Sequence, residues 1–298
     1  MLALGLAATL GACASQEAWE TRLDADHPLV GRVWDRNAGA FIDPATLPAR
    51  LADAEFVLLG EKHDNSDHQR LAARLVGEIA GARSFGTIGF DFLKSDRQAE
   101  IDAGARDLGG AFAPYVRIAD AARARGARIA ALNAPDALVR DVRTKGLDAL
   151  DDAARRRLAL DQPLDPSSEA AIAKDMRDSH CGMLPETAIP GMVAIQRLWD
   201  AHMAGQARAA AMLGDRRALL VVGANHARSD RGIPAMLARQ APGTRSLSLA
   251  FLEVAKGRDG PADYARNYDA AALPFDFVWF TPRASDGDPC AAFRRPSR

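Results

Sequence analysis

Two short motifs of the same form carry the residues best suited to chemistry. A glycine precedes a histidine by three positions twice, in Gly60-Glu-Lys-His63 and in Gly223-Ala-Asn-His226. Imidazole groups exchange protons near neutral pH and also bind transition metals, so a pair of them suits acid–base catalysis or a metal site. A glycine at the end of a strand permits a tight turn or the close approach of a ligand. The repeated motif therefore indicates a functional site rather than two solvated loops.

Carboxylates and amides accompany both motifs. If the strands that carry them are parallel, these groups meet at one edge of the sheet. The combination predicts catalytic residues of a hydrolase, or ligands of a divalent metal, at Glu61, His63, Asp91 and His226. The residues predicted to bind a ligand are His63, His68, Asn133, Asn225, His226 and His180. The alternative interpretation is a structural hydrogen-bond cluster beneath a loop.

Short apolar runs alternate with helical patterns along most of the chain. Because such runs are apolar throughout, they are typical of strands that are buried on both faces. The predicted strands span 55–60, 87–92, 128–133, 219–224, 246–251 and 277–280. Alternation of this kind predicts an α/β fold with a mostly parallel sheet flanked by helices.

The alternation is interrupted once. Residues 135–185 are charged and helical in pattern, which predicts a small inserted all-α subdomain. The α/β domain is then expected over 46–134 and 186–291, after an N-terminal lead-in over 13–45. A long helix follows the insert, and its apolar face of Met192, Ile195, Trp199 and Met203 is interpreted as core.

The N-terminus and the composition set limits on location and partners. The chain has 298 residues, and 38 Lys and Arg balance 39 Asp and Glu, which argues against nucleic-acid binding. Residues 1–12 are apolar but too short to span a bilayer, and they end in Leu-Gly-Ala before Cys13, which resembles a bacterial lipobox. We therefore expect a signal peptide over 1–12 and lipidation of Cys13. By similarity to bacterial lipoproteins, the absence of Asp after Cys13 favours the outer membrane.

Five segments resemble the ChaN family. They are HPLVG (27–31), LLGEKHDNSDHQ (58–69), MVAIQRLWDAHMA (192–204), GANHARSDRGIP (223–234) and FVWFTPRASDGDPCA (277–291). The resemblance implies a bacterial lipoprotein of haem binding and iron uptake, with a parallel-sheet domain, a small helical domain and dimers around stacked haems. It also implies a superfamily shared with the TIKI metalloproteases and erythromycin esterases, in which the two Gly-x-x-His motifs and an acidic residue form the active site.

Two departures from the family pattern concern the ligands. Asp91 stands where the family commonly has Glu, and the predicted insert contains no tyrosine, since the chain has only Tyr115, Tyr264 and Tyr268. His180, Cys181 and Met183 offer alternative iron ligands, or else mark a helix end with a disulfide cysteine. An oxidising envelope predicts a disulfide between Cys181 and Cys290, the two cysteines that remain after lipidation.

Together these features predict a lipid-anchored protein of the bacterial envelope that binds haem or iron and takes part in their uptake. Its expected partners are haem or iron, the membrane through the lipid, an outer-membrane haem or iron receptor, and a second copy of the chain. The alternative function is a hydrolase, with or without a metal, that uses His63 and His226.

Overall fold

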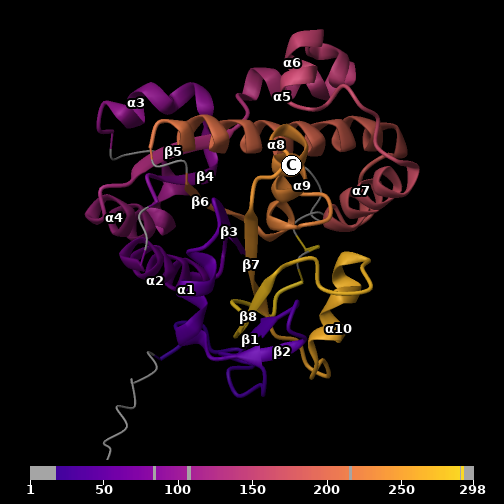
Figure 1. The fold of residues 1–298 in the computed structure, drawn as a ribbon. Coiled ribbons are helices and arrows are strands. Elements are labelled where there is room, and N and C mark those ends of the chain that lie inside the picture. The colour runs from indigo at the N-terminus through magenta and orange to yellow at the C-terminus, as the bar shows by residue number, and fades with distance from the viewer. Residues whose placement is uncertain (1–17, 83–84, 106–108, 215–216, 289, 292–298) are drawn as a thin grey trace, which may run out of the picture.

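A computed structural model describes residues 18–82, 85–105, 109–214, 217–288 and 290–291, and Figure 1 shows their fold. Residues 1–12 and Cys13, for which a signal peptide and a lipid anchor are expected, lie outside the described residues. An eight-stranded sheet has the order β2-β1-β8-β7-β3-β6-β4-β5. Its strands are β1 Val33–Asp35, β2 Ala40–Ile42, β3 Phe56–Glu61, β4 Thr87–Lys94, β5 Arg128–Asn133, β6 Ala218–Gly223, β7 Ser246–Glu253 and β8 Phe277–Thr281.

The predicted α/β fold with a mostly parallel sheet is confirmed. All six predicted runs are strands, and these six pair in parallel from β8 to β5. Ten α-helices accompany them in the described part of the chain. They are α1 Leu47–Leu51, α2 Ser66–Ala82, α3 Gln98–Asp102, α4 Val116–Ala124, α5 Asp136–Lys145, α6 Asp152–Arg157, α7 Pro166–Ser179, α8 Ile189–Met212, α9 Ile233–Gln240 and α10 Pro261–Ala265.

Two cores hold the layers together, one on each face of the sheet. Alternate residues of a strand point to opposite faces, so Leu58 of β3 packs in one core and Leu59 in the other. The first core contains Leu198 of α8 and Leu237 of α9, and the second contains Leu75 of α2. In Figure 1 the long helix α8 accordingly lies across the strands, on the side away from α2 and α4.

The N-terminal segment is more than a lead-in. It forms the hairpin of β1 and β2, which extends the sheet by antiparallel pairing of β1 with β8. Buried Val33 joins the core beside Trp279, although the short strands give little apolar periodicity from which to predict them. Asp67 fixes the start of this segment, because its carboxylate accepts hydrogen bonds from Thr21 and Glu20.

Residues 135–185 are helical and contain no strand, and all of them are described. They share cores with the rest of the fold, since Val139 and Leu158 belong to the core of α8. A smaller core joins Ile172 of α7 to Val193 near the start of α8. The insert therefore packs along α8 rather than as a body with a core of its own.

A disulfide joins the end of α7 to the C-terminal segment. Cys181 and Cys290 are bonded with their Cα atoms 5.7 Å apart. A crosslink across 109 positions of sequence restricts the unfolded chain, so it stabilises the packing of the insert.

None of the helices in the described ranges is long and apolar enough to cross a bilayer.

One glycine lets the two central strands carry their loops close together. A Cβ at Gly60 would lie 2.8 Å from Cβ of Ala227, in the 3-10 helix Ala224–Ala227 (η6) that follows β6. We expect Gly60→Ala to lower the free energy of unfolding by about 1–3 kcal/mol through this overlap. Gly77→Ala is the control, since a Cβ at Gly77 of α2 meets nothing within 4 Å and alanine favours a helix by up to about 1 kcal/mol. Thermal unfolding of both variants measures the effects, and equal behaviour would contradict this account.

Candidate functional site

The candidate site lies where the connections leave the sheet in opposite directions. β3 and β6 are neighbours in register, with Glu61 opposite Gly223. The helix after β3 is α2, in the second core, whereas the helix after β6 is α9, in the first. In an α/β sheet, such a switch point opens a crevice outside the carboxyl ends of the strands. Both Gly-x-x-His motifs end in this crevice.

His63 is held by a buried carboxylate. Its Nδ1 lies 2.5 Å from Oε1 of Glu61, whose side chain is 1% exposed. The hydroxyl of Tyr115 donates to the same oxygen at 2.7 Å, and Gln69 Nε2 donates to Oε2 at 3.1 Å. Glu61 is thus fully engaged within the protein, while the His63 side chain is 59% exposed.

This arrangement shifts the acid–base behaviour of the cluster. The hydrogen bond from His63 to Glu61 raises the pKa of His63 to about 9, although burial opposes the shift, and the charge of Asp91 adds to it. Burial and the Glu61 carboxylate raise the pKa of Tyr115, so its phenol stays protonated. His63 is therefore an imidazolium at neutral pH, and Tyr115 acts as a hydrogen-bond donor.

Asp91 reaches the same place from β4. Its Oδ2 accepts a hydrogen bond from the backbone N–H of Gly223 at 2.6 Å. A Cβ at Gly223 would lie 3.4 Å from Nε2 of His63 and 3.7 Å from that oxygen, so the three groups are neighbours. Burial raises the pKa of Asp91, and the charges of His226 and His63 oppose that rise. Asn133 supports the strand end by donating to the main-chain carbonyl of Asp91.

His226 has a carboxylate partner of its own. Its Nδ1 lies 2.7 Å from Oδ1 of Asp200 on α8, whose side chain is 4% exposed. Gln196, one turn earlier, donates to Oδ2 of Asp200 at 3.0 Å. Burial lowers the pKa of His226, but the Asp200 carboxylate outweighs it and the net shift is upward. Carboxylates orient both histidines through Nδ1, and Nε2 of each has no hydrogen-bond partner among the described residues.

A cleft of about 640 Å³ opens above these residues, a volume within the range of small-molecule sites. The switch point, α7, α8 and the 3-10 helix Arg266–Tyr268 (η7) surround it. Its lining is mixed, with His63 and His226 on the sheet side and apolar or aromatic side chains around them. The latter are Met176, Met192, Trp199, Phe251, Leu252, Tyr264 and Tyr268.

Two polar atoms of the residues that line the cleft have no hydrogen-bond partner among the described residues. Nε1 of Trp199 is buried and unpartnered within the described ranges, although a buried indole N–H usually finds an acceptor. The hydroxyl of Tyr268 also has no hydrogen bond among the described residues, whereas that of Tyr264 accepts from Ala255 and donates to Arg258. Trp199 and Met192 therefore belong to the cleft, while Met203 is core as expected from the sequence.

Four of the predicted site residues meet at one point. The other predicted residues either line the cleft or support the strands around it. Glu61, His63, Asp91 and His226 meet at the switch point, and Asn225 and His180 line the cleft. His68 also borders the cleft, but its side chain is fully buried and has a structural role, because its Nδ1 accepts from the Lys62 N–H and its Nε2 contacts the Thr281 hydroxyl. Burial lowers its pKa to about 3, so it stays neutral. Asn133 lies beneath Asp91 and does not line the cleft.

The predicted metal ligands are not arranged around a metal. Among the described residues, no group of three or more His, Cys, Asp or Glu side chains could hold an ion. The reason is that Glu61 is engaged by His63, Tyr115 and Gln69, and Asp91 by the Gly223 amide. Cys181 is bonded to Cys290, and Met183 is 59% exposed and does not line the cleft, so His180 alone remains of the three alternative iron ligands.

Sequence reasoning missed the partners of the two histidines. Asp200 and Gln196 lie in the same helical segment as Trp199, and a carboxylate within a mostly apolar helix was a usable signal. Gln69 ends the first motif segment. Tyr115 and Tyr268 had no local signal, because only the fold brings their segments to the switch point and the cleft.

The comparisons with known proteins agree with this fold. The family model described as "Haem-binding uptake, Tiki superfamily, ChaN" matches residues 47–237. The ChaN structure of Campylobacter jejuni, which concerns cofacial haem binding, superposes with a TM-score of 0.63 at 16% identity and covers 83% of this chain and 95% of that chain. The type III effector HopBA1 has a TM-score of 0.42 at 15% identity over 80% and 92% of the two chains, too low to support an argument. No curated protein matches the chain.

The contact between His63 and Glu61 can be tested by titration. A pKa raised above the ordinary 6.5 means that protonated His63 stabilises the fold below about pH 6.5, and that this stabilisation is lost as the pH rises through about 9. We expect Glu61→Gln to move the pKa of His63 from about 9 back toward 6.5, measured by NMR of the imidazole. Glu78→Gln on the exposed side of α2 is the control and should leave it unchanged. A pKa that stays near 9 in Glu61→Gln would show that another group causes the shift.

Proposed function

The chain belongs to the ChaN family of the Tiki superfamily, and on that premise we propose that it binds haem in the cleft at the switch point and takes part in haem uptake. The observation that carries the proposal is the aromatic and apolar side chains of this cleft, among them Met192 and Trp199, together with Tyr268, whose hydroxyl makes no hydrogen bond among the described residues.

The composition of the cleft fits haem. Haem offers a broad apolar ring, carboxylates at one edge, and an iron that takes an axial ligand from the protein. Met176, Met192 and Trp199 supply apolar surface for the ring. Lys62 and the imidazolium of His63 also line the cleft, and each is paired with a carboxylate, Lys62 with Glu253 and His63 with Glu61. An apolar pocket with a few placed polar groups is the usual form of such a site.

Tyr268 is the tyrosine best placed to act as the axial ligand of the haem iron. Tyrosine is an established axial ligand of haem iron. The hydroxyl of Tyr115 is bonded to Glu61 and that of Tyr264 to the backbone, so both are already engaged. Tyr268 lines the cleft with its hydroxyl unbonded in the described structure. Burial raises its pKa, but the guanidinium of Arg228, 5.2 Å from the ring centroid, favours the phenolate that iron requires.

A haem titration compares two tyrosines of one cleft. We expect the wild-type protein to bind haem with a shifted Soret band, and Tyr268→Phe to change the band and weaken binding at least about tenfold, equivalent to roughly 1.4 kcal/mol. Tyr264→Phe should leave the band unchanged, because its hydroxyl bonds only the backbone. An unaltered band in Tyr268→Phe would assign the iron to another ligand, such as His180. Failure of the wild-type protein to bind haem would contradict the function itself.

We also propose that a lipid on Cys13 anchors the protein to the bacterial envelope, in the outer membrane. Support comes from the apolar residues 1–12 and the lipobox-like sequence before Cys13. A homodimer and an outer-membrane receptor are the partners that the family resemblance predicts. The hydrolase interpretation of His63 and His226 stays a prediction of the same kind.

The anchor has a direct test in the membrane fraction. Two or more acyl chains hold a protein firmly on a membrane, whereas a short apolar segment does not. Cys13→Ala should therefore move the protein from the membrane to the soluble fraction. The matched control is the double variant Cys181→Ala and Cys290→Ala, which loses the disulfide but keeps Cys13 and should stay with the membrane. Retention of Cys13→Ala in the membrane fraction would rule out this anchor.

A further inference from the structure

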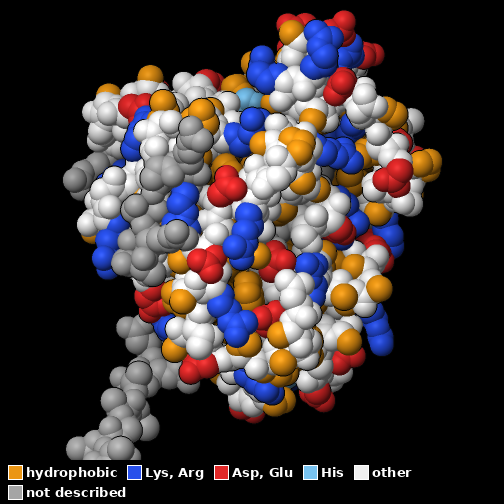
Figure 2. All heavy atoms as spheres, in the orientation of Figure 1, with side chains coloured by type: hydrophobic (Ala, Val, Ile, Leu, Met, Phe, Trp, Pro, Cys, Tyr) orange, Lys and Arg blue, Asp and Glu red, His pale blue; other side chains and the backbone are white. Residues whose placement is uncertain are grey.

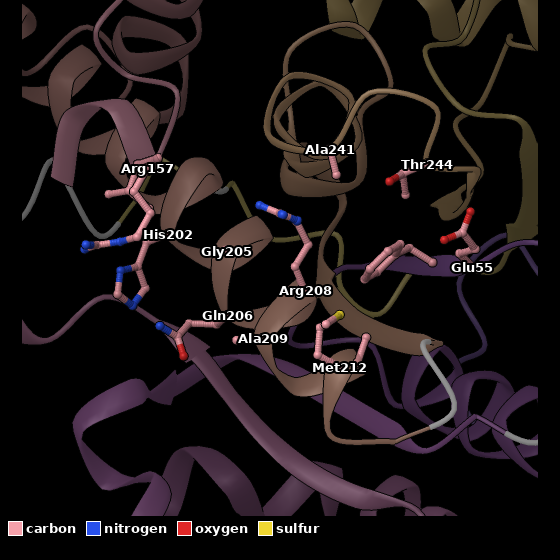
Figure 3. A pocket seen from close by; sticks show the side chains of 13 residues that line it. Glu55, Arg157, His202, Gly205, Gln206, Arg208, Ala209, Met212, Ala241 and Thr244 are labelled. Carbon is pink, nitrogen blue, oxygen red and sulfur yellow. The ribbon is translucent and has the colours of Figure 1, made fainter. Parts of the chain in front are cut away.

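A second cavity, called the hollow from here on, lies at the amino ends of the strands, whereas the cleft at the switch point lies at their carboxyl ends. Its volume is about 580 Å³, and it opens between the C-terminal half of α8, the end of α6, the start of β3 and the segment after α9 (Figure 3). β3 connects it with the haem cleft, because Phe56 begins the strand at the hollow and Glu61 ends it at the switch point. Six residues of strand span about 20 Å, so the two cavities are separate.

One stripe of α8 forms a wall of the hollow. Gly205, Arg208, Ala209 and Met212 recur at intervals of three and one, which places them on a single face of the helix. Figure 3 shows Arg208 and Met212 extending from α8 into the hollow, with Arg157 and His202 on one side and Glu55 on the other. The stripe therefore presents a cation and an apolar side chain to the same space.

The two arginines of the hollow have no counter-ion among the described residues. Neither Arg157 nor Arg208 has an ion pair or a side-chain hydrogen bond in the part of the chain that the structure describes, although most arginines there do. Burial and the charge of Arg157 lower the pKa of His202 to about 4, so His202 is neutral and its Nε2 contacts the Ser95 hydroxyl. Glu55, the acidic residue of the lining, accepts a hydrogen bond from the backbone N–H of Arg245, its neighbour at the start of the adjacent strand β7. The hollow thus carries a net positive charge.

The remaining lining is apolar. Phe56 and Leu158 are buried at its base, and Ala209, Ala211 and Ala241 add small apolar surfaces. Met212 at the mouth is 70% exposed, as is the adjacent Leu213, and these are the most exposed large apolar side chains in the described structure. Exposed apolar surface beside unpaired guanidinium groups is suited to a ligand that has both an apolar part and an anionic group.

We propose that this hollow binds an amphipathic anion, a single acyl chain with a carboxylate or phosphate head, with the head on Arg208 and Arg157 and the chain against Phe56, Leu158 and Met212. Guanidinium groups bind both kinds of head through paired hydrogen bonds. A free fatty acid and a single-chain phospholipid would share this chemistry.

Calorimetric titration of the full chain with four small probes tests the proposal. Dodecanoate and dodecyl phosphate, each below its critical micelle concentration, should bind at one site, and the tighter of the two identifies the head group. Inorganic phosphate tests the head alone, and dodecyltrimethylammonium tests the chain with the opposite charge. Both should bind at least about tenfold more weakly, because each lacks one half of the recognition. If inorganic phosphate bound as tightly as dodecyl phosphate, the hollow would be an anion site only. If dodecyltrimethylammonium bound as tightly as dodecanoate, the hollow would be an apolar site only. Either result overturns the proposal.

Three variants locate the binding. Arg208→Gln should weaken dodecanoate binding about tenfold or more through the lost charge-assisted contact. Met212→Gln should weaken dodecanoate and leave phosphate unchanged, and the exposure of this side chain keeps the fold intact. Arg125→Gln removes one charge from the exposed end of α4 and should change neither. Unaltered affinity in both Arg208→Gln and Met212→Gln would contradict the assignment. The Soret titration of Arg208→Gln should match that of the wild type, which separates this result from the fate of the haem proposal.

Discussion

Parallel pairing of β3 with β6 is the constraint on which the rest of the structure depends. It sets Glu61 opposite Gly223, so that the two Gly-x-x-His motifs leave the sheet side by side. Gly60 makes the pairing compatible with a tight connection, since a side chain there would collide with Ala227. The amide of Gly223 is then free to bind the Asp91 carboxylate, which ties β4 to the same point. The register of β3 and β6 thus brings together the groups that β3, β4 and β6 contribute to the site.

The electrostatics of the cleft follow from this placement. Glu61 and Asp200 are buried carboxylates, which are costly unless they are paired, and each is compensated by hydrogen bonds and by one histidine. The pKa of both histidines rises in consequence. On the sheet side the cleft therefore presents cationic groups that are each paired with a carboxylate, Lys62 with Glu253, His63 with Glu61 and His226 with Asp200. The opposite wall, from α7, α8 and η7, is mixed, with Met176, Met192, Trp199 and Tyr268 beside the polar side chains of Ser179, Gln196 and Asn267.

Helix α8 links the functional regions of the molecule. Its first half provides Met192, Gln196 and Trp199 to the cleft at the switch point, and its second half provides Arg208 and Met212 to the hollow at the amino ends of the strands. Between them it packs on the sheet and carries the helices of the insert.

Charged side chains of both signs are spread over the face seen in Figure 2, with no large area of one sign, in accord with the near-zero net charge.

The sequence by itself determined the α/β class, the six parallel strands and the meeting of the two motifs, because continuous apolar runs and glycine-histidine spacing are local properties. It also indicated Cys181 and Cys290 as partners. Only the tertiary structure decided which groups complete the site. Tyr115 and Asp200 bind Glu61 and His226 from elements that are distant in sequence, and His68 turned out to be structural because the fold buries both of its ring nitrogens against protein groups. Hydrogen-bond partners depend on which segments the packing brings within 3 Å of one another, and no pattern within a single segment encodes that distance.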